Sequence, residues 1–289
     1  MLTPEYLSGC ASYLLGMYDT LQEAMIADIA RRIIKTGQMT GTAEWQASRL
    51  TQCGLLIDDI TTQVANSSGK TEAEIRRLFE DSALIGITND AQPLIDAGIQ
   101  GEVKLSQAMA NFLEATVKKV NGNVYNMTLT TATTAGSTYM DATNLAYLEV
   151  ASGGYSYSEA IKKAVKTAAQ DGNYVSYGNS RSQLDVAVRR AVMTGINQTC
   201  AKMTEMYSAD MGVEYYEVSA HPGARESHAV WQGQVYKIDG AEYGYPNFEE
   251  STQYGDGAGL CGWNCRHSFF SILAGDIRPG ILRFKACGV

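Results

Sequence analysis

The sequence holds few of the residues and motifs on which most enzymes depend. It has 3 histidines and 6 cysteines among 289 residues. The HExxH pattern of zinc metalloproteases, the P-loop of nucleotide-binding proteins and the GxSxG turn of α/β-hydrolases are all absent. The zinc deaminase pattern fails as well, because Glu226 precedes His228 and three residues separate Cys261 from Cys265. These absences leave the metalloprotease, nucleotide-hydrolase, α/β-hydrolase and deaminase interpretations without a supporting motif.

Long apolar runs and a targeting segment are also missing. No stretch approaches the roughly 18 apolar residues of a membrane span. The N-terminal MLTPEYLSG lacks the basic start and the apolar core of a secretory signal. We therefore expect synthesis in the cytoplasm and no membrane partner. With Cys10 and Cys53 on apolar helical faces, the cysteines favour buried reduced thiols over a disulfide framework.

Basic residues are outnumbered, with 23 Lys and Arg against 31 Asp and Glu and a formal charge of -8. This excess of negative charge argues against a surface that binds nucleic acid everywhere. A local basic face remains open. The segment RSQLDVAVRRAVMTGINQT predicts a helix with Arg181, Arg189 and Arg190 opposite its apolar stripe. These arginines either form a solvated face with nearby acids or contact DNA phosphates.

Apolar residues recur at helical spacing through the first 205 residues or so. The pattern predicts one helix over 3–37 and another over 53–64 that ends at a turn over 66–69. Thr71 and Glu74 then form a capping box for the next helix. Further helices are predicted around Leu113 to Val120, around Ile161 to Val165, and from Ser182 to Met203.

The segment NMTLTTATTAGSTYMDATNLAYLEVASGG is rich in threonine and small residues, so propensity alone does not decide its structure. Leu145, Leu148 and Glu149 restore a helical rhythm, and Gly153 with Gly154 provides a stop. We therefore predict a helix.

After Gly212 the pattern changes to short extended pieces, VEYYEVSA and GQVYKI, separated by Gly and Pro turns. The sequence therefore predicts a mainly α N-terminal region with a small α+β C-terminal module. We place the helical region at 1–205 and the module at 206–289.

The module gathers the metal-capable side chains of the chain. Imidazole and thiolate are the ligands that zinc prefers. The candidate metal ligands in the module are His221, His228, Cys261, Cys265 and His267. Cys265 and His267 lie two apart, so in an extended segment both side chains point to one face. Cys261 joins them if the turn over 262–264 folds back, and His228 arrives from the preceding strand and turn, with His221 as the competing fourth ligand.

Two interpretations of this cluster stay open, a structural zinc site and a metal-free cluster of buried thiols held by hydrogen bonds. A third, a Cys261 or Cys265 nucleophile with a histidine base, fits less well because residues so close in sequence are more typical of ligands or core. Arg225 and Arg266 flank the two halves of the cluster, as do Trp231 and Trp263. Packing and carbonyl bridging explain these four residues better than ligand recognition does, because no catalytic motif lies nearby.

The pieces SQLDVAVRRAVMTGINQT, HPGARESHAVWQG and GLCGWNCRHSFF resemble the phage minor capsid protein 2 family. The SH…G…NCRH skeleton is more distantly similar to phage Mu F-like head morphogenesis proteins. The resemblance extends over most of the chain, including LAYLEVASGGYSYSEAI. The positions that match the family motif are His221, Arg225, His228, Trp231, Gly233, Gly262, Trp263, Asn264, Cys265, Arg266 and His267.

The resemblance implies a structural virion protein without enzymatic activity, built into the head during assembly in the host cytoplasm. It implies a place in the capsid interior or at the portal vertex, and the portal protein, other head proteins and packaged DNA as partners. The chain ends at ILRFKACGV, where relatives run on, so any function of a longer C-terminal extension is expected to be absent here or lost by truncation.

Two alternative functions remain. One is a metal- or cysteine-dependent enzyme in the module, a nuclease or a peptidase, which would keep an open coordination position. The other is a helical DNA-binding module, which salt-dependent binding would reveal.

Overall fold

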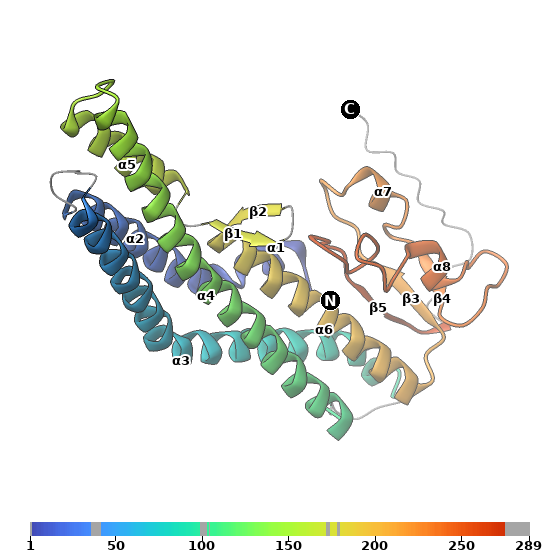
Figure 1. The fold of residues 1–289 in the computed structure, drawn as a ribbon. Coiled ribbons are helices and arrows are strands. Elements are labelled where there is room, and N and C mark those ends of the chain that lie inside the picture. The colour runs from blue at the N-terminus through green and yellow to red at the C-terminus, as the bar shows by residue number, and fades with distance from the viewer. Residues whose placement is uncertain are drawn as a thin grey trace. The chain divides into compact units, whose positions relative to one another are not determined.

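The protein is mainly helical, with a small sheet near its C-terminus (Figure 1). The computed structural model describes residues 2–35, 42–98, 103, 105–171, 174–177 and 180–274. The helices are α1 (Pro4–Gly9), α2 (Ser12–Lys35), α3 (Ala43–Asp96), α4 (Gln107–Ala151), α5 (Tyr157–Asp171), α6 (Leu184–Met211), α7 (Glu226–Ala229) and α8 (Phe248–Thr252). The strands are β1 (Tyr174–Tyr177), β2 (Ser180–Gln183), β3 (Tyr215–Val218), β4 (Val235–Lys237) and β5 (Phe269–Ile272). The predicted fold class is confirmed.

Tertiary contacts group the chain into two compact units. The helical unit comprises Ser12–Glu74 and Asn121–Arg189, and the mixed unit comprises Met1–Ala11, Ile75–Val120 and Arg190–Val289. Helices α3, α4 and α6 each contribute one part to each unit. The division predicted at residue 205 follows the change from helices to short strands, whereas these units follow contacts between segments far apart in sequence.

The core of the helical unit rests on small residues. Alanines of α4 and α5 at three- and four-residue spacing pack against apolar residues of α2 and of the first part of α3. The threonines of α4 do not break the helix, because hydroxyls such as those of Thr128 and Thr131 donate to carbonyls four residues back at 2.8 and 3.0 Å. The predicted helix and its stop at Gly153 are confirmed, since α4 ends at Ala151 and Gly153 has φ +74.

The predicted turn over 66–69 is wrong, because α3 runs through it without interruption. The Ser67 and Ser68 hydroxyls donate to the carbonyls of Val64 and Ala65 at 3.0 and 2.7 Å, which satisfies them inside the helix. Buried Val64 before this segment and buried Ile75 after it hold the helix in place. Packing therefore overrides the weak local preference for a turn, and the expected capping box is not a helix start.

Two other helix boundaries differ from the prediction. The helix expected over 3–37 is divided into α1 and α2 at Cys10 and Ala11, and Gly37 lies outside the described residues. The helix expected from Ser182 begins at Leu184, because 180–183 form β2, which pairs antiparallel with β1.

The sheet of the mixed unit has the order β4-β3-β5, with both pairs antiparallel (Figure 1). The two extended pieces predicted after Gly212 correspond to β3 and β4, whereas β5 was not predicted as a strand. One face is covered by aromatic residues that surround Phe248. The ring centroids of Tyr216, Tyr254 and Phe269 lie 4.9, 5.3 and 4.7 Å from that of Phe248. These edge and tilted contacts form the core of the module.

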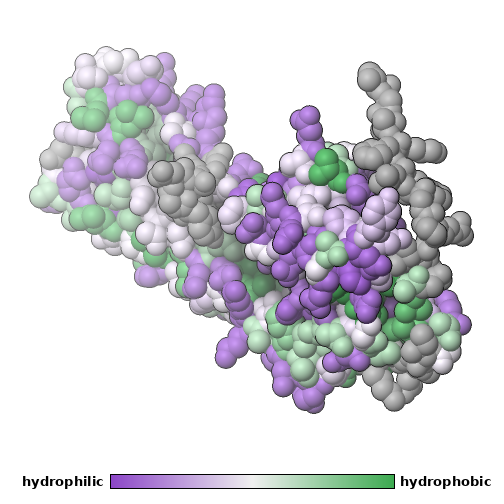
Figure 2. Space-filling view, turned by 90° about the vertical axis from the view of Figure 1, so that its right-hand side faces the viewer, coloured by the Kyte–Doolittle hydropathy of each residue, from purple (hydrophilic) through white to green (hydrophobic). Residues whose placement is uncertain are grey.

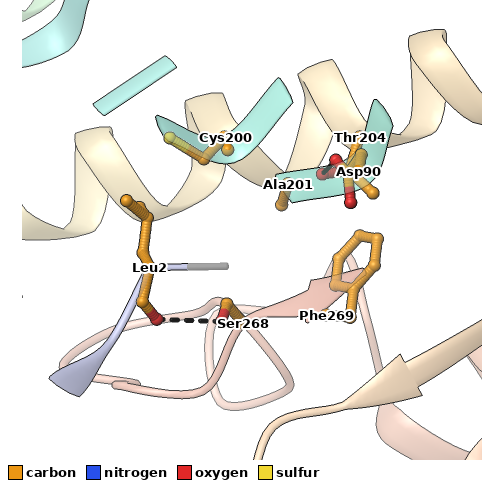
Figure 3. Close-up of a pocket in the computed structure, with 8 residues that line it drawn as sticks. Leu2, Asp90, Cys200, Ala201, Thr204, Ser268 and Phe269 are labelled. Carbon is orange, nitrogen blue, oxygen red and sulfur yellow. Dashed lines mark hydrogen bonds between the residues drawn. The ribbon is translucent and has the colours of Figure 1, made fainter. Parts of the chain in front are cut away.

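Asp90 joins α3, α6 and β5 within the mixed unit. Its carboxylate accepts a hydrogen bond from the Thr204 hydroxyl at 2.6 Å and one from the Ser271 backbone N–H at 3.3 Å. Figure 3 shows Asp90 beside Thr204 in a small pocket, together with the bond from the Ser268 hydroxyl to the Leu2 carbonyl, 3.1 Å long. Burial raises the pKa of Asp90 to about 6. Strand β5 is therefore tied directly to the helices of its own unit.

Apolar side chains are scattered over the surface. On the face shown in Figure 2, hydrophilic residues are interspersed with hydrophobic ones. In the module, Val230 and Trp263 are 62% and 65% exposed. Within the described part of the chain, no helix combines the length and apolarity that crossing a membrane requires.

Candidate metal centre

Three buried side chains of the module converge on one point. The Cys265 Sγ lies 3.6 Å from the Nδ1 of His228 and 3.6 Å from the Nδ1 of His267. All three potential ligand atoms lie within 4.8 Å of one another. With zinc bonds of about 2.3 Å to sulfur and about 2.0 Å to nitrogen, a tetrahedral site has a sulfur-to-nitrogen edge of about 3.6 Å. The two sulfur-to-nitrogen distances therefore already match those between zinc ligands.

The loop before Cys265 is held by backbone hydrogen bonds. Its N–H groups at Leu260 and Trp263 donate to the carbonyls of Thr252 and Gly257 at 3.0 and 2.7 Å. Glycine is required at Gly262, because a Cβ there would lie 2.3 Å from the carbonyl oxygen of Gly257. The glycines of GLCGWNC thus permit a turn tight enough to present Cys265 beside His267.

Helix α6 fixes the backbone that carries the two candidate ligands Cys265 and His267. The Asn197 side-chain amide donates to the carbonyls of Cys265 and His267 at 3.2 and 3.0 Å. Asn197 is 1% exposed, so no water competes for these bonds. One amide group therefore sets the spacing between the two ligand residues.

The protonation of His228 is set by its surroundings. Its Nε2 lies 3.0 Å from the carbonyl oxygen of Ala258, which can only accept, so Nε2 carries the hydrogen. The Nδ1 that faces Cys265 therefore presents a lone pair. A ring nitrogen that donates to a backbone carbonyl is the usual support of a metal-binding histidine. The Trp231 ring packs against His228, with centroids 4.3 Å apart, and fixes the orientation of the imidazole.

Burial keeps the cluster uncharged. It lowers the pKa of His228, and it lowers the pKa of His267 to about 4, with the neighbouring histidines adding to the effect. Burial also raises the pKa of the Cys265 thiol, while hydrogen bonds to its sulfur act in the opposite direction. The two imidazoles are thus in the neutral form that binds metals at neutral pH.

The other two candidate ligands lie beside this group of three. His221 packs against His267, with ring centroids 4.2 Å apart. Its Nδ1 is 3.0 Å from the Pro222 carbonyl, and its Nε2 is buried without a hydrogen-bond partner among the described residues. The Cys261 thiol donates instead to the His267 carbonyl at 3.5 Å. Cys261 has φ +58, a conformation that is costly for a residue with a side chain.

The motif residues around the cluster have distinct positions. The Arg225 guanidinium donates to the Trp263 carbonyl and so joins the two sequence halves of the site. Gly233 has φ +62, and its N–H donates to the Val218 carbonyl at 2.8 Å. Asn264 and Arg266 are exposed.

The predicted basic face of one helix is wrong for Arg181, because the helix begins only at Leu184. Arg189 and Arg190 are exposed neighbours on α6. Arg181 lies in β2, and its side chain is outside the described part of the structure.

Sequence reasoning did not identify Asn197 or the Ala258 carbonyl as parts of the site. One feature of the sequence points to Asn197, which is a polar residue directly after Ile196 of the predicted apolar stripe. No feature of the sequence points to Ala258, because only its backbone carbonyl contacts His228.

Comparison with known proteins gives one match. A family model described as phage minor capsid protein 2 matches residues 2–279. No curated protein and no solved structure matches the chain.

Proposed function

The chain belongs to the phage minor capsid protein 2 family, and from this membership we propose that it is built into the head of a tailed phage at the portal vertex. As a minor capsid protein it has other phage head proteins as partners. The portal protein is the partner that we propose for the helical region, residues 1–205. The observation that carries the proposal is the family match over residues 2–279.

The geometry of the module supports a structural role over an enzymatic one. His228 and His267 are 2% and 1% exposed, and Cys265 is 8% exposed. A catalytic metal or nucleophile needs a position open to substrate and water. Such burial suits a site that holds the module together. The SH…G…NCRH skeleton of this site supports a relation to Mu F-like head morphogenesis proteins.

Exposed apolar residues on the helical unit suit association with other helices. Leu145 and Leu148 lie three residues apart on α4 and are 41% and 61% exposed. Residues at this spacing share one helix face. Such a pair is able to anchor a partner helix.

Co-expression with the portal protein of the same genome should give a complex that survives gel filtration at moderate salt. Replacement of Leu145 and Leu148 by serine should weaken it, whereas Leu84→Ser, at a residue 55% exposed in the mixed unit, should not. Mass spectrometry of purified particles should detect the chain at low copy number. Persistent separation of the two proteins at micromolar concentration, with the chain absent from particles, would contradict the proposal.

We further propose that Arg181, Arg189 and Arg190 contact packaged DNA. The net charge of -8 restricts any such contact to a local face. Binding should therefore be weak, independent of sequence and steeply dependent on salt.

Replacement of these three arginines by glutamine should lower DNA affinity at low salt by at least roughly tenfold and reduce the salt slope by about three. The matched control removes three positive charges elsewhere, at Arg31, Arg76 and Arg77, which pair with acidic residues. Fluorescence anisotropy with labelled duplex DNA measures the affinity and its salt dependence for each variant. Equal losses in the two variants would show that overall charge, and not this face, governs binding.

A further inference from the structure

In the cluster of His228, Cys265 and His267, two imidazole nitrogens face one thiol sulfur, although the thiol can donate only one hydrogen bond. One thiol sulfur faces two imidazole nitrogens at equal distances of 3.6 Å. The thiol has one proton, and His228 Nδ1 is an acceptor because its Nε2–H donates to Ala258. In a metal-free cluster, the thiol donates its proton to the Nδ1 of His228. His267 must then donate its own Nδ1–H to the sulfur. With or without a metal at Nδ1, the Nε2 of His267 has no hydrogen-bond partner among the described residues, so the two states differ only at the sulfur and the two Nδ1 atoms.

We propose that His228, Cys265 and His267 bind a zinc ion that closes the C-terminal module. The donor set of one thiolate and two imidazoles suits zinc, whereas calcium and magnesium prefer oxygen ligands. Binding forms a zinc–sulfur bond as the thiol proton leaves to solvent, and both histidines bind through Nδ1 in their neutral form. The site does not depend on where the protein lies in the particle.

We take His221 as the fourth ligand, although it lies beside, and not in, the group of three whose ligand atoms are within 4.8 Å of one another. Its Nδ1 faces the Pro222 carbonyl and carries the hydrogen, so its buried Nε2 presents a lone pair that has no other partner among the described residues. The ring already packs against His267, and the His221 N–H is held by the Gln232 side chain at 2.7 Å. Four protein ligands give the closed site that is typical of structural zinc.

Cys261 stays outside the zinc site, although it lies in the same short motif. Its thiol is directed to the His267 carbonyl at 3.5 Å, away from the group formed by His228, Cys265 and His267. Cys261 and Cys265 therefore provide a matched pair of buried cysteines, of which only one is a ligand.

The first experiment uses the full-length protein without substitutions. Protein purified without added metal should contain close to one zinc ion per chain by inductively coupled plasma mass spectrometry. Removal of zinc by a chelator should lower the melting temperature. Addition of cobalt to the apoprotein should give the visible bands of a tetrahedral ion and a near-ultraviolet band from a thiolate bound to cobalt. These spectra test the ligand set even where a variant fails to fold.

Variants then separate the ligands from their neighbours. Cys265→Ser should abolish the thiolate-to-cobalt band and lower zinc affinity more than about a hundredfold, since even indirect supporting residues contribute 10- to 100-fold. Cys261→Ser should keep the thiolate-to-cobalt band and the zinc affinity, because serine can still donate to the His267 carbonyl. His221→Ala should retain the thiolate band but bind zinc more weakly. Absence of zinc with no cobalt spectrum in the wild type overturns the proposal, as does equal loss in the two cysteine variants.

Discussion

Replacement of Arg49 by alanine is expected to destabilise the helical unit by about 3 kcal/mol or more. Arg49 is 1% exposed, and its guanidinium donates to the Thr143 hydroxyl, the Gln46 side chain and the Met140 carbonyl at 2.9, 2.8 and 2.9 Å. It also lies 4.6 Å from the centroid of the Trp45 ring. Truncation removes these bonds and the cation–π contact, and it leaves a cavity between α3 and α4.

The loss should be measured by urea unfolding of the full chain, followed by circular dichroism. Arg49→Met keeps most of the packed volume and removes the buried charge, so it should cost less than half as much as alanine. Arg31→Ala is the control at a surface position, because the Arg31 side chain is 68% exposed, and it should change stability by less than about 0.5 kcal/mol. If Arg49→Ala costs less than about 1 kcal/mol, the guanidinium does not join the two helices as described.

Helices were predictable wherever packing and periodicity agree. Ile29 and Ile33 of α2, together with Ile60 of α3, fall on predicted apolar stripes, and all three are buried. The continuity of α3 was not predictable, because Asn66 to Gly69 have the composition of a turn and only burial on both sides keeps them helical. Strands β1, β2 and β5 were not predicted, and length is not the reason, because β3 also has 4 residues and was predicted.

The residue types of the candidate site were predictable, whereas its final geometry was not. The spacing of Cys265 and His267 indicated one face, and the structure places both in the group of three possible ligands. The predicted approach of His228 agrees with the structure, whereas the turning of Cys261 toward the His267 carbonyl depends on a left-handed backbone at Cys261. Backbone conformation and hydrogen bonds to main-chain oxygens cannot be predicted from the identity of the residues alone. Asn197 shows how a distant helix can complete a site whose ligands lie close together in sequence.

The stability of the mixed unit should depend on pH through Asp90. This residue is 2% exposed, and burial raises its pKa to about 6 from 3.8. Between these two values the folded state binds more protons than the unfolded state, so stability must fall as the pH rises through this window. The stabilising contribution is complete below about pH 4 and is lost above about pH 6. A difference of about two units corresponds to about 3 kcal/mol.

Asp90→Asn removes this dependence, because a neutral amide has no charge to desolvate. Its oxygen can accept from the Ser271 N–H, and its NH₂ group can donate to the Thr204 hydroxyl, so the links to β5 and α6 persist. We expect the variant to be more stable than the wild type by about 1–3 kcal/mol at pH 7.5 and to show a flatter profile between pH 4 and 6. Asp96→Asn, at an exposed position of the same helix, removes an equal charge and should leave the slope unchanged. Urea unfolding at several pH values distinguishes these outcomes. A less stable Asp90→Asn protein at pH 7.5 would show that the carboxylate contributes more through its two hydrogen bonds than its burial costs.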